Sequence, residues 1–374
     1  MKIAILTFHR AYNCGAMLQA WALRTVLERM GHTVEFPVLN HVGERNRWLK
    51  MIDFRKRGMD LIRSFIGRFL LNVFSVPCED TLRTRYKRFR EVFLPERVCD
   101  AADLSEIYDL LIVGSDQVWS ERHSLSDSAL FFGESLPVDV KKITYAASYG
   151  DKPLDENILK RVVDAVNRFS KVSVREPLAK KQLTEYALKK IDVVADPTLL
   201  LTEEDYYVLS KNIKVPDEPY LFMYTLSSDK FFVNTAKALA RRLKVKCIIA
   251  PCYQYSRFRA PIGLTYAISP DRLVALVRGS KYVLAGSFHG TVMGIIFNKP
   301  FLSLRAQVDE YESRPVALLN RIGCSERLVT PKTSLDEMEA LLRTEVDEEV
   351  YNKLAQFRTN SLSWLKGAVG CKMV

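Results

Sequence analysis

The chain has 374 residues, which is enough for two domains of ordinary size, each with its own core. Its 48% hydrophobic and 26% charged residues are typical of a globular protein, and no apolar segment approaches the length needed to span a bilayer. The seven scattered cysteines contain no CxxC pair, which argues against a zinc site or a disulfide framework and predicts a cytoplasmic location. The formal net charge of +11 predicts anionic partners.

The N-terminal part begins with a βαβ pattern. A buried strand is expected at Lys2–Thr7, a periodic helix at Gly15–Met30 and a second strand at His32–Val38. Such an opening predicts a parallel, doubly wound α/β sheet, whose ligands bind in the loops at the carboxyl ends of the strands. Three further strands are expected, each ending in a polar or charged turn: Asp109–Val113, Lys141–Ala147 and Val172–Val174.

Residues 41–97 interrupt this alternation with 14 Lys and Arg against 7 Asp and Glu. Within them, Leu61–Val76 is apolar with two arginines, a pattern that suits a helix lying on an anionic membrane surface. The alternative, which we favour, is an inserted helical lid or a solvated cationic face covering the sheet edge. Peripheral contact with the inner face of a membrane therefore stays open.

The alternation resumes after Tyr206–Pro219, a polar and proline-containing stretch that predicts a hinge. Strands are expected at Tyr220–Thr225, Cys247–Ala250, Tyr282–Ala285 and Phe301–Leu304, and helices at Phe231–Leu243, Asp271–Arg278, Thr291–Phe297, Ser334–Leu342 and Val346–Leu365. We therefore expect two Rossmann-like, doubly wound domains facing a cleft, over residues 1–205 and 206–345. For the C-terminal helix of residues 346–374, packing back onto the first domain is one option.

The stretch Lys281–Phe301 has the pattern of an anion site. It combines a short buried strand, a turn that contains two glycines, and an apolar helix. The first turn of a helix presents unpaired N–H groups and the positive end of the helix dipole to an anion. His289 adds an imidazole to this turn, and its neighbours Ser287, Gly290 and Thr291 favour the anion site over the alternative, a βα unit with a satisfied histidine.

Six phrases occur in order along the chain: TFHRAYNCGAMLQAWAL (Thr7–Leu23), VGSDQVW (Val113–Trp119), TYAASYG (Thr144–Gly150), SVRE (Ser173–Glu176), DPTLLL (Asp196–Leu201) and AGSFHGTVMGIIFNKPF (Ala285–Phe301). Together they resemble the polysaccharide pyruvyltransferase family. The resemblance implies a fold like the B-type glycosyltransferases, and transfer of a pyruvyl group from phosphoenolpyruvate to sugar hydroxyls as a ketal. It also implies a polysaccharide or lipid-linked oligosaccharide acceptor. Cys14 departs from the aromatic residue that is usual in its loop.

The resemblance further implies residues that bind the donor. The family's arginine falls on Arg175 and its basic histidine on His289, which could stabilise the departing phosphate or donate a proton. Arg175 can hold the phosphate or the carboxylate of phosphoenolpyruvate in bidentate fashion. The backbone of Gly290 and Thr291 can hold the phosphate. The alternative for Arg175 is a structural pair with Glu176 or another acid.

Three residues are expected on the acceptor side. Asp116 is a candidate base toward the acceptor hydroxyl, with a cap on the following helix as the alternative. Asn13 and Gln117 are candidates for hydrogen bonds to the sugar, with turn and cap roles as the alternative. Asp196, by contrast, is expected to be a structural turn or hinge residue.

Two other functions stay open. One is a glycosyltransferase with a nucleotide-sugar donor, since a fold does not fix a function. The other is a non-catalytic polysaccharide-binding protein, against which the presence of both Arg175 and His289 argues. Nucleic-acid binding rests only on the basic charge and ranks last. No Walker motif, HExxH motif or paired metal carboxylates occur, so we expect neither a metal nor a cofactor. A homo-oligomer is left open.

Overall fold

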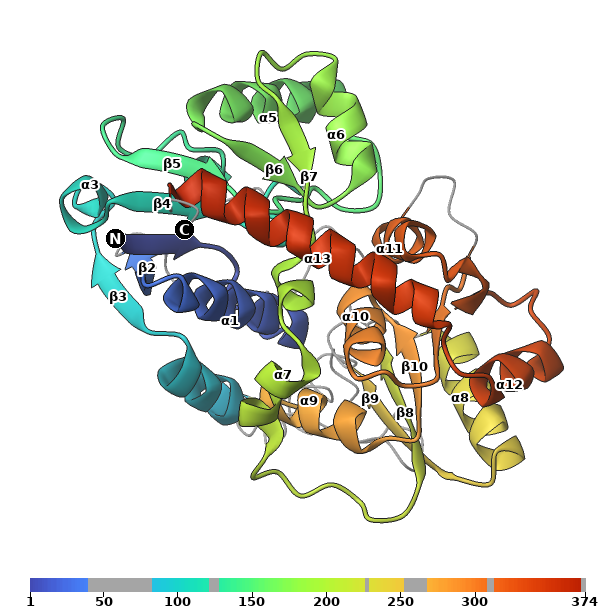
Figure 1. Cartoon of the computed structure of the whole chain (residues 1–374). Coiled ribbons are helices and arrows are strands. Elements are labelled where there is room, and N and C mark those ends of the chain that lie inside the picture. The colour runs from blue at the N-terminus through green and yellow to red at the C-terminus, as the bar shows by residue number, and fades with distance from the viewer. Residues whose placement is uncertain (40–82, 121–127, 226–228, 252–267, 308–312, 371–374) are drawn as a thin grey trace, which may run out of the picture.

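The computed structural model describes residues 1–39, 83–120, 128–225, 229–251, 268–307 and 313–370 (Figure 1). The predicted helix Leu61–Val76 lies outside the described residues, as does most of the predicted insertion. Within the described part of the chain, no helix is both long and apolar enough to cross a membrane.

The N-terminal half forms a parallel sheet with the strand order β3-β2-β1-β4-β5. Its strands are β1 (Lys2–Leu6), β2 (Thr33–Leu39), β3 (Glu96–Cys99), β4 (Leu110–Val113) and β5 (Lys141–Thr144). Two more strands, β6 (Val172–Val174) and β7 (Ile191–Val193), pair with each other, and single backbone bridges join β6 to the region of β5. The end of the predicted insertion is corrected here, because residues 96–97 belong to β3. This edge strand is largely exposed, so no apolar run marks it in the sequence.

The C-terminal half forms a second parallel sheet with the order β12-β11-β10-β8-β9. Its strands are β8 (Tyr220–Thr225), β9 (Lys246–Pro251), β10 (Tyr282–Gly286), β11 (Phe301–Leu304) and β12 (Leu328–Val329). All six residues of β8 and all four of β11 are buried, as expected for parallel strands covered on both faces. The two-sheet α/β architecture predicted from the sequence is confirmed; where one domain ends and the next begins stays a prediction.

Helices cover both sheets. They are α1 (Cys14–Arg29), residues 83–93, α3 (Leu104–Ile107), α4 (Ser128–Phe131), α5 (Glu156–Arg168), α6 (Pro177–Thr184), η3 (Pro197–Leu200), α7 (Glu203–Ser210), α8 (Lys230–Arg242), α9 (Pro270–Gly279), α10 (Phe288–Ile296), α11 (Arg314–Ile322), η4 (Ser325–Arg327), α12 (Leu335–Arg343) and α13 (Glu348–Val369).

The predicted hinge is partly wrong, because its first residues belong to helix α7. Thr202 and Asp205 form a capping box that begins this helix, and three acidic residues in its first turn suit the positive end of the dipole. Tyr206 is buried between two rings, with ring centroids 5.2 Å from Trp21 and 6.0 Å from Phe297. The apolar core thus continues from α1 through α7 to the end of α10, and it joins the two halves.

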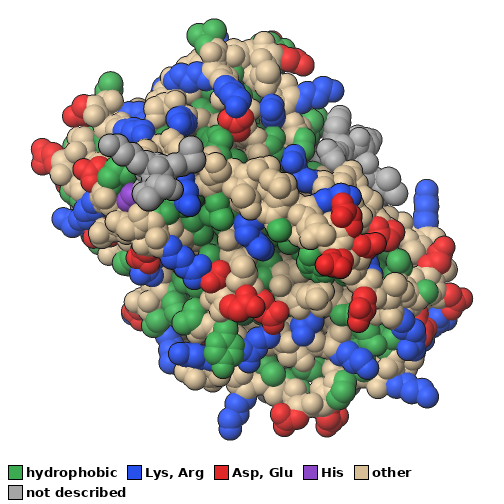
Figure 2. Space-filling model, viewed as in Figure 1, with side chains coloured by type: hydrophobic (Ala, Val, Ile, Leu, Met, Phe, Trp, Pro, Cys, Tyr) green, Lys and Arg blue, Asp and Glu red, His purple; other side chains and the backbone are tan. Residues whose placement is uncertain are grey.

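The long helix α13 starts beside α11 and ends on the N-terminal sheet (Figure 1). Near its end, the backbone carbonyl of Ala368 accepts a hydrogen bond of 2.9 Å from Lys141 Nζ, and Trp364 Nε1 donates to Asp192 at 3.0 Å. The chain therefore crosses between its two halves twice, which fixes their relative position. On the face seen in Figure 2, basic and acidic side chains are interspersed, so the net positive charge does not gather there.

Candidate functional site

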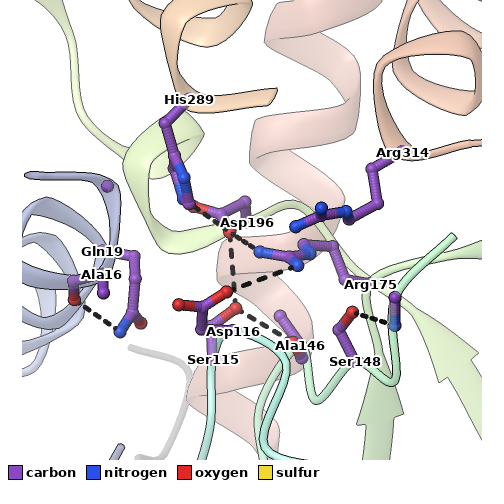
Figure 3. A network of polar contacts seen from close by, with 12 residues as sticks. Ala16, Gln19, Ser115, Asp116, Ala146, Ser148, Arg175, Asp196, His289 and Arg314 are labelled. Carbon is purple, nitrogen blue, oxygen red and sulfur yellow. Dashed lines mark hydrogen bonds and ion pairs between the residues drawn. The ribbon is translucent and has the colours of Figure 1, made fainter. Parts of the chain in front are cut away.

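Polar residues gather at four strand ends of the N-terminal half, and two of them, Arg175 and Asp196, reach the first turn of α10. Asp116 follows β4, Ser148 follows β5, Arg175 follows β6 and Asp196 follows β7 (Figure 3). His289 reaches this cluster from the C-terminal half. The carboxyl ends of parallel strands all face one edge of a sheet, which is where α/β proteins bind their ligands. The site therefore lies where the two halves meet.

Arg175 is the cation at the centre of the cluster. Its Nε donates to Glu176 Oε1 at 2.9 Å, and its Nη1 donates to Asp196 Oδ2 at 2.7 Å. Its Nη2 lies 3.7 Å from Asp116 Oδ1 and has no hydrogen-bond partner among the described residues. Burial alone lowers the pKa of Arg175, but the charges of Glu176 and Asp196 outweigh it, and the net pKa is raised. The structural pairing is therefore present, and the buried Nη2 still has unused hydrogen-bonding capacity.

Asp196 has a larger role than the structural turn or hinge role that the sequence predicted for it. Its Oδ1 caps η3 by accepting from the Thr198 backbone N–H at 3.0 Å, as a turn residue would. Its Oδ2 meets Arg175 at 2.7 Å and lies 3.7 Å from His289 Nε2. Burial raises the pKa of this carboxyl, but His289 and Arg175 together hold it well below its usual range. Asp196 is thus a fixed negative charge between two candidate donor-binding residues.

His289 lies inside the first turn of α10, because this helix begins at Phe288, three residues before the predicted start at Thr291. The reason is that Ser287 caps this helix, accepting from the Gly290 backbone N–H at 3.1 Å. The His289 ring packs on the start of α1. A methyl group added to Gly15 would lie 2.8 Å from His289 Cε1 and nearer still to His289 Nδ1. Glycine at position 15 therefore allows the two halves to close on the imidazole.

The predicted use of the α10 backbone as an anion cradle needs correction. The N–H of Gly290 is taken by Ser287 Oγ, and the N–H of Thr291 donates to the Ser287 carbonyl at 3.1 Å. The Thr291 hydroxyl shares a 2.9 Å hydrogen bond with Ser303. Because these donors already serve the helix, Gly290 and Thr291 are not open to an anion in this conformation.

Asp116 does not cap a helix within the described residues, since none begins between it and residue 120. Its backbone is in the left-handed region with φ 76° and forms a bridge with Ala147. Its carboxylate faces Arg175. This placement suits a group aimed into the site better than the alternative role of a cap.

Asn13 and Gln117, two of the predicted acceptor-side residues, both form hydrogen bonds within the protein. Asn13 caps α1, since its Oδ1 accepts from the backbone N–H groups of Gly15 and Ala16 at 2.9 and 3.2 Å, so the predicted cap role is present. Gln117 lies against Arg314, and with its amide oxygen turned to the guanidinium it accepts from Nη1 and Nη2 at 2.8 and 2.9 Å. Cys14 shares a 3.0 Å hydrogen bond with Tyr86, so an aromatic ring does lie at this loop.

Gln19 was not anticipated from the sequence, although it lies within the first family-like phrase. This fully buried amide donates from Nε2 to Thr7 Oγ1 at 2.9 Å and to the Ala16 carbonyl at 2.8 Å. Its Oε1 has no hydrogen-bond partner among the described residues, and Figure 3 places it on the same side of the site as Asp116. An unpaired buried oxygen is costly, so Gln19 Oε1 is a candidate hydrogen-bond acceptor for a bound group.

Two parallel α/β domains that close over a shared site define the class of the B-type glycosyltransferases and related sugar-nucleotide enzymes. The chain has this fold. UDP-GlcNAc 2-epimerase from Methanocaldococcus jannaschii matches it with a TM-score of 0.52 and 11% identity, over 97% of this chain and 100% of the epimerase. UDP-GlcNAc 2-epimerase from Neisseria meningitidis, bound to UDP-GlcNAc, matches with 0.51 and 12%, over 100% of both chains. At such identities the likeness shows the fold alone.

Within this fold class, the sequence identifies the family to which the chain belongs. The family model described as polysaccharide pyruvyl transferase matches residues 13–306, and the chain belongs to that family. This confirms the resemblance read from the six phrases. No curated protein matches the sequence significantly.

Proposed function

We propose that this protein transfers a pyruvyl group from phosphoenolpyruvate to hydroxyls of a polysaccharide or lipid-linked oligosaccharide and forms a ketal. Membership of the family supports pyruvyl transfer. The observation that carries the proposal is the buried Arg175–Asp196–His289 cluster at the junction of the two halves. A site that only binds sugar needs neither a buried arginine with an open donor nor an imidazole beside it.

The donor would bind through charge-assisted hydrogen bonds. Two buried nitrogen atoms, Arg175 Nη2 and His289 Nε2, have no hydrogen-bond partner among the described residues. A phosphate oxygen between them would satisfy both groups. Asp196 has a positioning role in this arrangement, because its carboxylate holds the Arg175 guanidinium at 2.7 Å and lies 3.7 Å from His289 Nε2.

The reaction then balances in four steps. A proton adds to the methylene carbon of phosphoenolpyruvate, and the neighbouring carbon gains oxocarbenium character. The first sugar hydroxyl adds to that carbon and gives its proton to Asp116. The C–O bond to phosphate breaks, and the electron pair leaves with the phosphate, which His289 stabilises or protonates. A second hydroxyl adds to the same carbon and closes the ketal. The two hydroxyl protons replace those taken up by the methylene group and the phosphate.

A nucleotide-sugar donor is the competing function, since epimerase structures of the same fold are bound to UDP-GlcNAc. The two donors can be separated by thermal unfolding. A ligand that binds only the native state raises the Tm by mass action. We expect phosphoenolpyruvate to raise it and UDP-GlcNAc to leave it unchanged.

The reaction itself is tested by incubating the protein with phosphoenolpyruvate and lipid-linked sugars. Phosphate release together with a pyruvyl mass gain on the sugar is the expected result. Arg175→Lys should abolish the Tm shift by phosphoenolpyruvate, since lysine keeps the charge but loses the fork geometry. A Tm shift by UDP-GlcNAc alone would overturn the proposal in favour of a nucleotide-sugar enzyme.

A further inference from the structure

Arg314 is the first residue of α11, and its side chain crosses to the N-terminal half. Its Nε donates to Asp151 Oδ1 at 2.9 Å and its Nη2 to Asp151 Oδ2 at 3.2 Å. Its backbone N–H also donates to Asp151 Oδ1 at 2.9 Å, so this aspartate caps α11 from the opposite half. Ser313, at the N-cap position, makes no side-chain cap bond. The Arg314 side chain is thereby held in one orientation.

This orientation places Arg314 beside the candidate donor site. The Cζ atoms of Arg175 and Arg314 lie 4.9 and 5.9 Å from the centroid of the same ring, that of Phe288. Figure 3 shows the two arginine side chains next to each other. Both arginines line one pocket between α11, α13 and the strand ends after β6 and β7. Its other lining residues include Glu176, Phe288, Leu318 and Phe357. Two guanidinium groups from opposite halves thus share one pocket wall.

The hydrogen-bond capacity of the two arginines leaves donors for a ligand. A guanidinium has five N–H donors. Arg175 uses two of them, toward Glu176 and Asp196. Arg314 uses Nε and Nη2 toward Asp151, and Gln117 accepts from Nη1 and Nη2, which leaves one Nη1 hydrogen. An anion with two separate charged groups could therefore bond to both arginines without breaking the Asp151 pair.

We propose that Arg314 is a second donor-binding arginine, which holds the carboxylate of phosphoenolpyruvate while Arg175 and His289 hold its phosphate. This inference rests on the proposed function. The phosphate belongs beside His289, because the leaving group needs charge neutralisation there, and Asp196 ties His289 to Arg175. Arg314 contacts Asp151, Gln117 and Phe288 instead, so its remaining Nη1 hydrogen can serve the other anionic group. Both groups of phosphoenolpyruvate would then be bound only when the two halves of the molecule lie together as in this structure.

Two ligands and three variants test this assignment by calorimetry. In Arg314→Gln we expect the affinity for phosphoenolpyruvate to fall about tenfold or more, because a charge-assisted hydrogen bond is lost. Inorganic phosphate has no carboxylate, so its affinity should stay within about twofold of wild type. Asp151→Asn removes the interdomain ion pair but keeps the guanidinium, and it should lower the Tm while retaining phosphoenolpyruvate binding. Arg343→Gln removes an exposed arginine that pairs with Glu339 and should change neither ligand.

Equal losses of phosphoenolpyruvate affinity in Arg314→Gln and Asp151→Asn would overturn the inference, since Arg314 would then act only through the ion pair. So would an unchanged affinity in Arg314→Gln. If wild type binds phosphate but not phosphoenolpyruvate, the proposed function itself fails, which is a distinct result.

Discussion

Gly15 offers the sharpest test of the closed site, because its missing side chain is what lets α1 pack on His289. In Gly15→Ala the new methyl carbon would lie 2.8 Å from the ring Cε1 and closer to Nδ1, whereas ordinary contacts begin at 3.4 Å. The ring cannot easily turn away, because the residue is only 8% exposed and sits against Asp196. Either the imidazole shifts by roughly 1 Å or the two halves separate, at about 1–3 kcal/mol.

The expected effect on catalysis exceeds the effect on stability. A displacement of this size in a catalytic group can lower turnover about 100-fold. We expect the Tm of Gly15→Ala to fall by a few degrees. The assay is phosphate release from phosphoenolpyruvate in the presence of acceptor, measured alongside the Tm of each variant.

Gly367 provides the matched control. It lies in α13, and a methyl group there would meet nothing within 4 Å. Gly367→Ala should therefore keep full turnover and gain about 0.5–1 kcal/mol of stability from helix propensity. If Gly15→Ala keeps normal turnover and normal stability, α1 does not press on His289 in solution, and the closed geometry is refuted.

The remaining predictions concern the His289 ring and the ion pair between Asp151 and Arg314. His289→Asn should keep the fold and weaken phosphoenolpyruvate binding modestly, but lower kcat on the order of 100-fold, as steady-state kinetics would show; near-normal turnover would assign the ring a structural role. Burial raises the pKa of Asp151, but Arg314 outweighs it and holds the pKa well below its ordinary value of 3.8. This stabilisation is present above pH 4 and is lost as the pH falls further, so the Tm of wild type should drop more steeply below about pH 4 than that of Asp151→Asn. Parallel curves would show that the ion pair contributes nothing.

Local patterns were enough to predict the two parallel sheets. Apolar runs such as those of β1 and β10 mark buried strands, and the periodic Gly15–Met30 segment gave α1 within a residue of its start and end. Elements without such a signal were missed. The edge strand β3 is polar. Helix α11 is different, because its buried residues Ala317, Leu318 and Ile322 do recur at helical spacing, and the sequence interpretation overlooked this short pattern.

The site was predictable only in part, for a reason that Asp196 illustrates. An aspartate before a proline has the pattern of a turn or cap, and Asp196 Oδ1 does cap η3. The second oxygen, Oδ2, makes the contacts with Arg175 and His289, and these partners are distant in the chain. No local pattern reports such contacts. The same holds for Arg314, whose partner Asp151 is 163 positions away.

The segment that places Asp196 is held by a helix outside the matched family region. The Ala195 backbone N–H donates to Ser361 Oγ at 2.9 Å, and Arg358 Nε donates to the Leu199 carbonyl at 2.7 Å. Both partners lie in α13, whereas the family model ends at residue 306. Because Asp196 in turn orients Arg175 and lies beside His289, α13 supports the proposed donor site through this segment, and its Phe357 also lines the pocket beside Arg175 and Arg314. The helix therefore couples the position of the two halves to the geometry of the charges between them.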